Sequence, residues 1–212
     1  GAGHDVEGAI DGGIEGFILE ALKHRAEKDE LLLAPCIDLG RVYATGHSGG
    51  GWMIYRLACE LSDRLAAVAP VAGGFLFDPA TCAPARPVPL IHFHGTADPR
   101  VPYDATSTAT GPPGTKVTPG VESATRWAEI NGCDADAETS FEKADWTCRT
   151  HHGCSDGAEV TLCSIAGMGH PWPGGDPGAG FGPLGAAIVG PASTTLNASD
   201  YMWGEFFARF RR

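Results

Sequence analysis

Hydrophobic residues follow two different spacings along the chain, and these predict its strands and helices. Residues 65–72 and 88–93 are almost continuously apolar, and 41–45 and 159–165 are shorter strand-like runs. Continuous apolar runs are typical of strands that are covered on both faces of a parallel sheet. We therefore predict four strands, with 65–72 and 88–93 at the centre of the sheet.

Helical spacing of apolar residues marks four segments around these strands. The segments are 14–22, 50–63, one beginning at Thr118 and Pro119, and a last one in which Met202, Trp203, Phe206, Phe207 and Phe210 share one face. Alternating strands and helices predict an α/β fold class, a mainly parallel sheet flanked by helices, with 1–212 as a single domain. The segments 104–120 and 167–190 are rich in glycine and proline and predict long surface loops.

Composition narrows the range of partners. The chain has 212 residues and a formal net charge of -11, which disfavours nucleic acid because that partner needs a basic surface. No apolar run approaches the roughly 18 residues of a membrane span, so we expect no membrane insertion. The chain starts at Gly1 without a recognisable signal peptide, and we expect it to be processed or truncated.

Seven cysteines in this length favour an oxidising compartment, and hence a secreted or periplasmic protein. A zinc site formed by Cys148, Cys154, His151 and His152 is the alternative, but the spacing matches no common zinc motif, so we expect no metal and no cofactor. The odd count leaves one cysteine without a partner within the chain. Asn197 begins a glycosylation sequon and reads equally as the polar start of the last helix.

Gly46, His47, Ser48, Gly49 and Gly50 match the G-x-S-x-G nucleophile elbow, between a predicted strand and a predicted helix. Glycines on both sides of the serine avoid collisions in a turn this tight. The turn exposes the hydroxyl and brings the Gly49 N–H to the helix start, where it can donate to an oxyanion. In isolation the pentapeptide would be an ordinary glycine-rich turn.

A serine nucleophile needs a histidine base and an acid, which follow it in the order serine, acid, histidine. Asp98 follows the 88–93 strand and His170 follows the 159–165 strand, so both should lie at the edge of the sheet that holds Ser48. Each alone would be an ordinary loop residue. Asp104 is the reserve acid, that is, the alternative candidate for the acidic residue should Asp98 not fill this role.

Four further residues have weaker claims to a role in the site. His92 and His94 lie on one strand face, where a metal pair is one interpretation and support of the acid loop by hydrogen bonds is the one we favour. His47 is a candidate substrate-binding residue rather than a base. Trp172 follows His170 in a loop and is a second candidate for substrate binding, although most tryptophans pack in cores.

These motifs resemble those of the secreted polyhydroxybutyrate depolymerases and the related feruloyl and acetylxylan esterases. The similar stretches are 43–74, 89–103, 159–175 and 199–210. The resemblance implies an α/β-hydrolase without a metal, with Ser48 as nucleophile, Asp98 as acid and His170 as base. It also implies the disulfides Cys59–Cys82, Cys133–Cys163 and Cys148–Cys154.

The family's N-terminal strands and their second oxyanion donor have no counterpart in this sequence, so we expect an N-terminally truncated fold in which only Gly49 is identifiable as a donor. Cys36 would then have lost its partner.

The leading expectation is a secreted serine ester hydrolase of the depolymerase type. A feruloyl or acetylxylan esterase is the alternative, and a serine peptidase is a weaker one. The last expectation, from a different functional class, is a non-catalytic polymer- or carbohydrate-binding protein on a degenerate hydrolase fold. The oligomeric state is left open.

Overall fold

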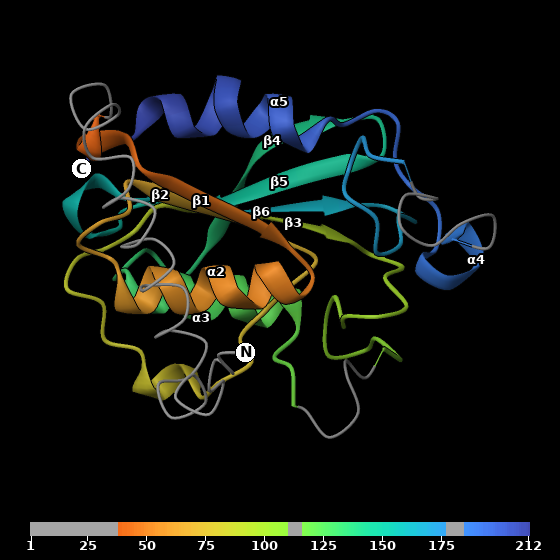
Figure 1. The fold of residues 1–212 in the computed structure, drawn as a ribbon, viewed down its shortest axis with the longest axis horizontal. Helices are drawn as coiled ribbons and strands as arrows, with labels where there is room; N and C mark the ends of the chain where they lie inside the picture. The colour runs from red at the N-terminus through yellow and green to blue at the C-terminus, as the bar shows by residue number, and fades with distance from the viewer. Residues whose placement is uncertain (1–37, 110–115, 177–184) are drawn as a thin grey trace, which may run out of the picture. The chain divides into compact units, whose positions relative to one another are not determined.

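The computed structural model describes residues 38–109, 116–176 and 185–212, and within it Leu39–Arg212 form a compact unit. Its centre is a six-stranded sheet in the order β1-β2-β3-β6-β5-β4 (Figure 1). The strands are β1 Tyr43–His47, β2 Ala67–Val71, β3 Leu90–Gly95, β4 Ala137–Lys143, β5 Trp146–His151 and β6 Val160–Ile165. Strands β1, β2, β3 and β6 are parallel, so their carboxyl ends share one edge.

Helices cover both faces of this sheet, with α2 and α3 on one side and α5 on the other (Figure 1). The α-helices are α2 Gly49–Glu60, α3 Gly120–Ile130, α4 Gly185–Val189 and α5 Ala198–Tyr201. A π-helical turn, Met202–Phe206, and a 3-10 turn, Phe207–Arg209, continue α5; other 3-10 turns are Leu39–Arg41, Pro79–Thr81 and Ser155–Gly157. The α/β fold class predicted from sequence is confirmed.

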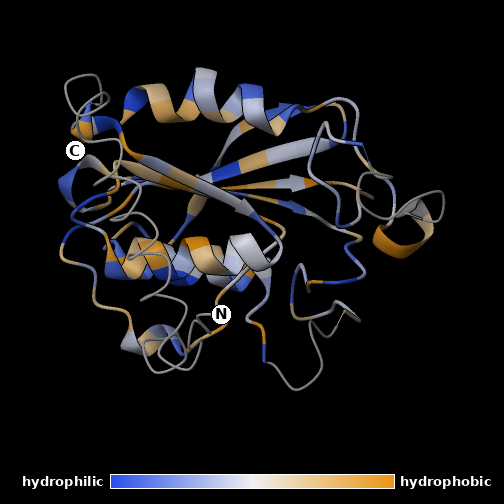
Figure 2. Cartoon of the chain, in the orientation of Figure 1, coloured by the Kyte–Doolittle hydropathy of each residue, from blue (hydrophilic) through white to orange (hydrophobic). Residues whose placement is uncertain are grey.

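Two apolar clusters hold the layers together, one on each face of the sheet. Strand residues such as Val68 and Leu90 pack with Tyr55 and Trp127 of α2 and α3. Their sequence neighbours point to the opposite face, where Phe93 packs with the segment after α5. Figure 2 shows hydrophobic residues along the central strands and on both helical layers. This two-sided burial explains the continuous apolar runs of β2 and β3.

The hairpin β4–β5, whose strand β5 pairs antiparallel to β6, was not predicted from the sequence. Five of the seven β4 residues are exposed polar or charged residues, so β4 lacks the apolar run that marked the buried strands. The predicted strands and the helices after Ser48 and Pro119 are present, with ends shifted by a few residues. The predicted helix at 14–22 lies outside the described residues, as do parts of both predicted loops.

Two predicted disulfides are wrong. The structure contains Cys59–Cys82, as the resemblance implied, but joins Cys133 to Cys154 and Cys148 to Cys163. The cause is the antiparallel register of β5 and β6, which places Cys148 directly opposite Cys163. Hydrogen bonds also run between the segments after α3 and after β5, which brings the other two cysteines together. Cys36 lies outside the described residues.

The closing helix differs from its predicted face at one position. Met202, Phe206 and Phe207 are buried, but Trp203 is 63% exposed. The π-helical turn widens the spacing along this segment, so Trp203 is rotated out of the buried stripe and packs edge-on against Tyr43. At the start of α5, the side chain of Asn197 accepts a hydrogen bond from Asp200 N–H, which makes Asn197 the N-cap.

Candidate active site

Ser48 occupies the sharp turn between β1 and α2. Its backbone lies at φ 56° and ψ -114°, an unusual conformation for a residue with a side chain. The turn requires glycine at position 46, because a Cβ there would lie 2.6 Å from the Gly50 carbonyl carbon. A Cβ at Gly50 would meet no atom within 4 Å, so the expected steric need for glycine on both sides of the serine is wrong at Gly50. The Ser48 N–H donates to Val71 O over 2.9 Å, which ties the turn to β2. The strand–turn–helix context that a nucleophile elbow requires is therefore present.

His170 lies in the loop after β6, and its ring contacts both of the other predicted residues. Nε2 is 2.9 Å from Ser48 Oγ, and Nδ1 is 2.8 Å from Asp98 Oδ2. A carboxylate accepts, so Nδ1–H donates to Asp98, and Nε2 is then free to accept the Ser48 proton. His170 N–H donates to Val189 O over 2.6 Å, which holds the loop in place.

Asp98 follows β3 and is 4% exposed. Its Oδ1 accepts from Arg100 N–H at 2.7 Å and Val101 N–H at 2.9 Å. Burial by itself raises the pKa of the Asp98 carboxyl, but hydrogen bonds from His170 and His94 outweigh it and hold the pKa well below its usual range. Asp98 is thus a fixed negative charge beside His170.

Other candidates occupy different places. The reserve acid Asp104 is half-buried and accepts hydrogen bonds from Thr106 N–H and Thr106 Oγ1–H. His92 and His94 hydrogen-bond to each other over 3.1 Å, and His94 Nε2–H donates to Val101 O of the acid loop, as the favoured interpretation predicted. The cysteines of the zinc alternative are in disulfides and have no thiolate to coordinate with. In the described parts of the chain, no group of three or more histidine, cysteine or acidic residues is arranged to hold a metal ion.

His47 and Trp172 lie beside His170. His47 Nε2–H donates to the His170 carbonyl over 2.6 Å, and the two imidazole rings are 4.8 Å apart. The Trp172 ring lies edge-on to His47 at 6.4 Å. Burial lowers the pKa of His47, so the ring is neutral near neutral pH. The support that His47 gives to the His170 backbone was not apparent from sequence, because 123 residues separate the two.

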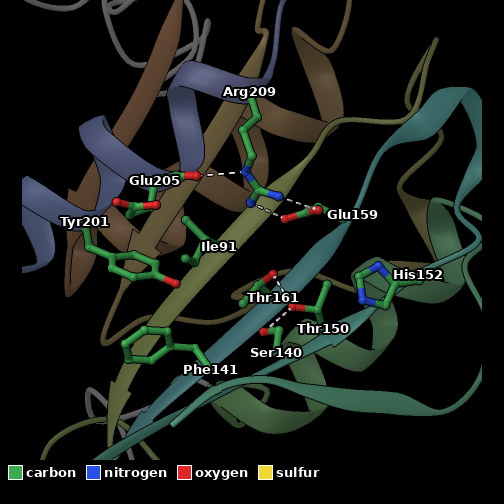
Figure 3. A pocket seen from close by; sticks show the side chains of 10 residues that line it. All are labelled: Ile91, Ser140, Phe141, Thr150, His152, Glu159, Thr161, Tyr201, Glu205 and Arg209. Carbon is green, nitrogen blue, oxygen red and sulfur yellow. Dashed lines mark hydrogen bonds and ion pairs between the residues drawn. The ribbon is translucent and has the colours of Figure 1, made fainter. Parts of the chain in front are cut away.

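A pocket of about 310 Å³ lies away from Ser48 and His170, near the opposite edge of the sheet (Figure 3). It is lined by Thr161 at the start of β6, by β4 and β5, and by the segment from Tyr201 to Arg209. Its polar groups mostly bond to one another: Thr150 contacts the Thr161 and Ser140 hydroxyls, and Arg209 pairs with Glu159. Their hydrogen-bonding capacity is therefore largely used, and we assign no reaction here.

Of the helices in the described segments, none combines the length and the apolar character needed to cross a membrane.

Comparison with known proteins gives esterases as relatives, although no protein-family model matches the chain. "Feruloyl esterase B" of Piromyces equi is 35% identical over 147 residues, covering 66% of this chain and 27% of that protein. "Putative esterase NocK" of Nocardia uniformis subsp. tsuyamanensis is 33% identical over 190 residues, covering 83% of this chain and 54% of that protein. A bifunctional acetylxylan esterase/xylanase of Neocallimastix patriciarum is 40% identical over 62 residues, which is 29% of this chain and 9% of that protein.

The chain thus spans about a quarter to a half of the first two relatives. Its strand order places Ser48, Asp98 and His170, in that chain order, at the carboxyl edge of one mainly parallel sheet. This arrangement is that of an α/β-hydrolase fold, and the sequence of the chain is similar to those of esterases.

Proposed function

We propose that this protein is a serine hydrolase of carboxylic esters, with Ser48 as nucleophile, His170 as general base and acid, and Asp98 as the orienting acid. The observation that carries the proposal is the continuous hydrogen-bonded path from Ser48 Oγ through His170 to Asp98 Oδ2. Neutral His170 accepts the hydroxyl proton as Ser48 Oγ attacks the ester carbonyl carbon. Asp98 stabilises the imidazolium that results.

The tetrahedral intermediate then collapses and expels the alcohol, which receives its proton from His170 Nε2. Water, deprotonated by His170, attacks the acyl-enzyme. The second tetrahedral intermediate releases the acid and expels Ser48 Oγ, which takes back its proton from His170 Nε2. The Gly49 N–H, at the first residue of α2, is the proposed oxyanion donor, favoured by the positive end of the helix dipole. No step requires a cofactor.

We propose hydroxycinnamoyl or acetyl esters of plant polysaccharides as the substrates, and we propose that the protein acts on them outside the cytoplasm. The names of the relatives support this choice, and the three disulfides support an oxidising compartment. Oligomers of 3-hydroxybutyrate, which the sequence resemblance favoured, are the second candidate. Trp172, next to His47 at the histidine loop, is the proposed wall of the acyl pocket.

Labelling with a fluorophosphonate probe tests the mechanism. Intact mass should show one adduct on the parent chain and on Ser199→Ala, an exposed serine control, and none on Ser48→Ala. No adduct on a folded parent would overturn the proposed mechanism and favour a binding protein. A panel of methyl ferulate, acetylated xylan and 3-hydroxybutyrate oligomers then tests the substrate, and turnover of the last alone would reject the plant-ester assignment.

A further inference from the structure

A chain of buried hydrogen bonds runs from helix α2 through strand β3 to the acid. The Tyr55 hydroxyl is 2.9 Å from His92 Nδ1, and His92 Nε2 is 3.1 Å from His94 Nδ1. His94 Nε2 in turn lies 3.2 Å from Val101 O and 3.4 Å from Asp98 Oδ2. Tyr55, His92 and His94 are fully buried, so water does not supply alternative partners for these bonds.

The chemistry of the two ends fixes the direction of every bond. The Val101 carbonyl and the Asp98 carboxylate can only accept, so His94 carries its proton on Nε2. The buried Tyr55 hydroxyl proton has His92 Nδ1 as its acceptor, so the His92 proton lies on Nε2 and is donated to His94 Nδ1. Burial lowers the pKa of His92 and raises that of Tyr55, which keeps both neutral. All three donors therefore point toward Asp98.

His94 completes the set of donors around the Asp98 carboxylate. Oδ1 accepts the N–H groups of Arg100 and Val101, and Oδ2 faces His170 Nδ1 and His94 Nε2. A carboxylate has about four lone-pair sites. Three of them accept full hydrogen bonds, and the fourth faces the His94 Nε2–H, which is shared with Val101 O. The orientation of Asp98 in turn determines the tautomer and direction of His170.

We propose that Tyr55, His92 and His94 form a one-way hydrogen-bond chain that positions Asp98 and tunes how strongly Asp98 stabilises the proton on His170. None of the three contacts Ser48 or His170 directly, so they are positioning residues. The inference rests on the proposed function, because it assigns these residues to the same reaction. It extends that function by tracing the site to a tyrosine in the core.

The surroundings of His94 offer few other charges. Tyr103 packs edge-on against its ring at 5.8 Å and bonds to the Ser164 hydroxyl. Helix α3 contributes Gly120, where a Cβ would collide with His94 Nδ1. The titratable groups facing His94 are thus His92, Asp98 and Tyr103. Around His170 they are Asp98 and His47.

Loss of the His94 donor should have two effects. The Asp98 carboxylate becomes free to turn, which lowers kcat, and its charge is less neutralised, so it stabilises the His170 imidazolium more strongly. The acid limb of kcat/KM should therefore move to higher pH. Hydrogen bonds to charged groups of this kind correspond to roughly 10- to 100-fold in rate.

The test compares His94→Leu, His94→Gln, Tyr55→Phe and the control Tyr103→Phe with the parent chain. Gln can place a donor near the Nε2 position, whereas Leu cannot. Tyr103→Phe removes a tyrosine hydroxyl that touches the same surroundings but lies off the chain. Measurements are kcat/KM for p-nitrophenyl acetate against pH, thermal unfolding, and ¹⁵N NMR of the histidine tautomers.

We expect the acid limb of kcat/KM to move to higher pH in His94→Leu and to move less in Tyr55→Phe. It should stay at the pH of the parent in His94→Gln and Tyr103→Phe. If His94→Leu does not fold, Tyr55→Phe decides the outcome by the same readout. An unshifted acid limb in folded Tyr55→Phe and His94→Leu would overturn the inference. So would ¹⁵N shifts showing a proton on His94 Nδ1. The tautomer measurement needs no activity, so a parent chain that fluorophosphonate does not label would reject the proposed function separately.

Discussion

His47 Nε2 donates a hydrogen bond to the main-chain carbonyl of His170 over 2.6 Å, from one side of the nucleophile turn to the loop that holds the proposed base. Because Ser48 follows His47 directly, this bond couples the position of the serine to that of the histidine. A residue that supports His170 in this way affects turnover more than substrate affinity.

His47→Leu should therefore lower kcat on the order of tenfold and leave KM nearly unchanged, since it removes one hydrogen bond that orients the base. Steady-state kinetics on methyl ferulate would measure the two parameters. The exposed His152 offers a matched control, and His152→Leu should change neither. A raised KM with normal kcat in His47→Leu would instead assign His47 to substrate binding.

Gly46 and Gly50 provide a matched pair for the turn. A Cβ at Gly46 would meet the Gly50 backbone at 2.6 Å, whereas a Cβ at Gly50 has no atom within 4 Å. Gly46→Ala should cost about 1–3 kcal/mol of unfolding free energy and reduce fluorophosphonate labelling of Ser48. Gly50→Ala should leave both the unfolding free energy and the labelling of Ser48 unchanged. Chemical denaturation and intact-mass labelling test this, and equal behaviour of the two variants would contradict the steric argument.

The disulfide Cys148–Cys163 joins directly opposed residues of β5 and β6, both fully buried. Replacing both with alanine should destabilise the protein by roughly 2–4 kcal/mol and lower its melting temperature, because the unfolded chain gains freedom. Non-reducing peptide mapping of the parent should recover this pair together with Cys133–Cys154. Recovery of Cys133 bound to Cys163 would show that β5 and β6 have a different register.

Acid should weaken the fold below about pH 6.5. Burial lowers the pKa of His92 in the folded state well below 6.5, its value in the unfolded state. At a pH between the folded-state pKa and 6.5, the unfolded state therefore binds a proton that the folded state does not. Stability from this group is complete above pH 6.5 and falls, by at most about 1.4 kcal/mol per pH unit, as pH decreases through the window. Below about pH 3.8, protonation of Asp98 on unfolding adds a loss of the same sign.

Urea unfolding at pH 7, 6 and 5 would measure this slope. His92→Gln, which has no titrating group at this position, should show a shallower dependence than the parent, with His152→Gln as the exposed control. A parent whose stability is constant between pH 7 and 5 would contradict a buried, neutral His92.

The sequence alone was sufficient for the central strands and for bringing Ser48, Asp98 and His170 to one edge. Strands buried on both faces need continuous apolar runs, and the serine turn needs glycine at position 46, so both features leave local signals in the sequence. The strand β4 leaves none, because one face meets solvent and most of its residues are polar. The outward rotation of Trp203 follows from a π-helical turn that the apolar spacing did not indicate.

The order of residues along the chain thus determined the fold class and the proposed chemistry, because a tight turn and a buried strand constrain which side chains can occupy them. Only the tertiary structure decided which distant residues of the chain contact one another. The antiparallel register of β5 and β6 selected the cysteine pairs, and the packing of α2 on β3 brought Tyr55 to His92. Such contacts join residues far apart in sequence, and they depend on how whole elements pack rather than on any local pattern.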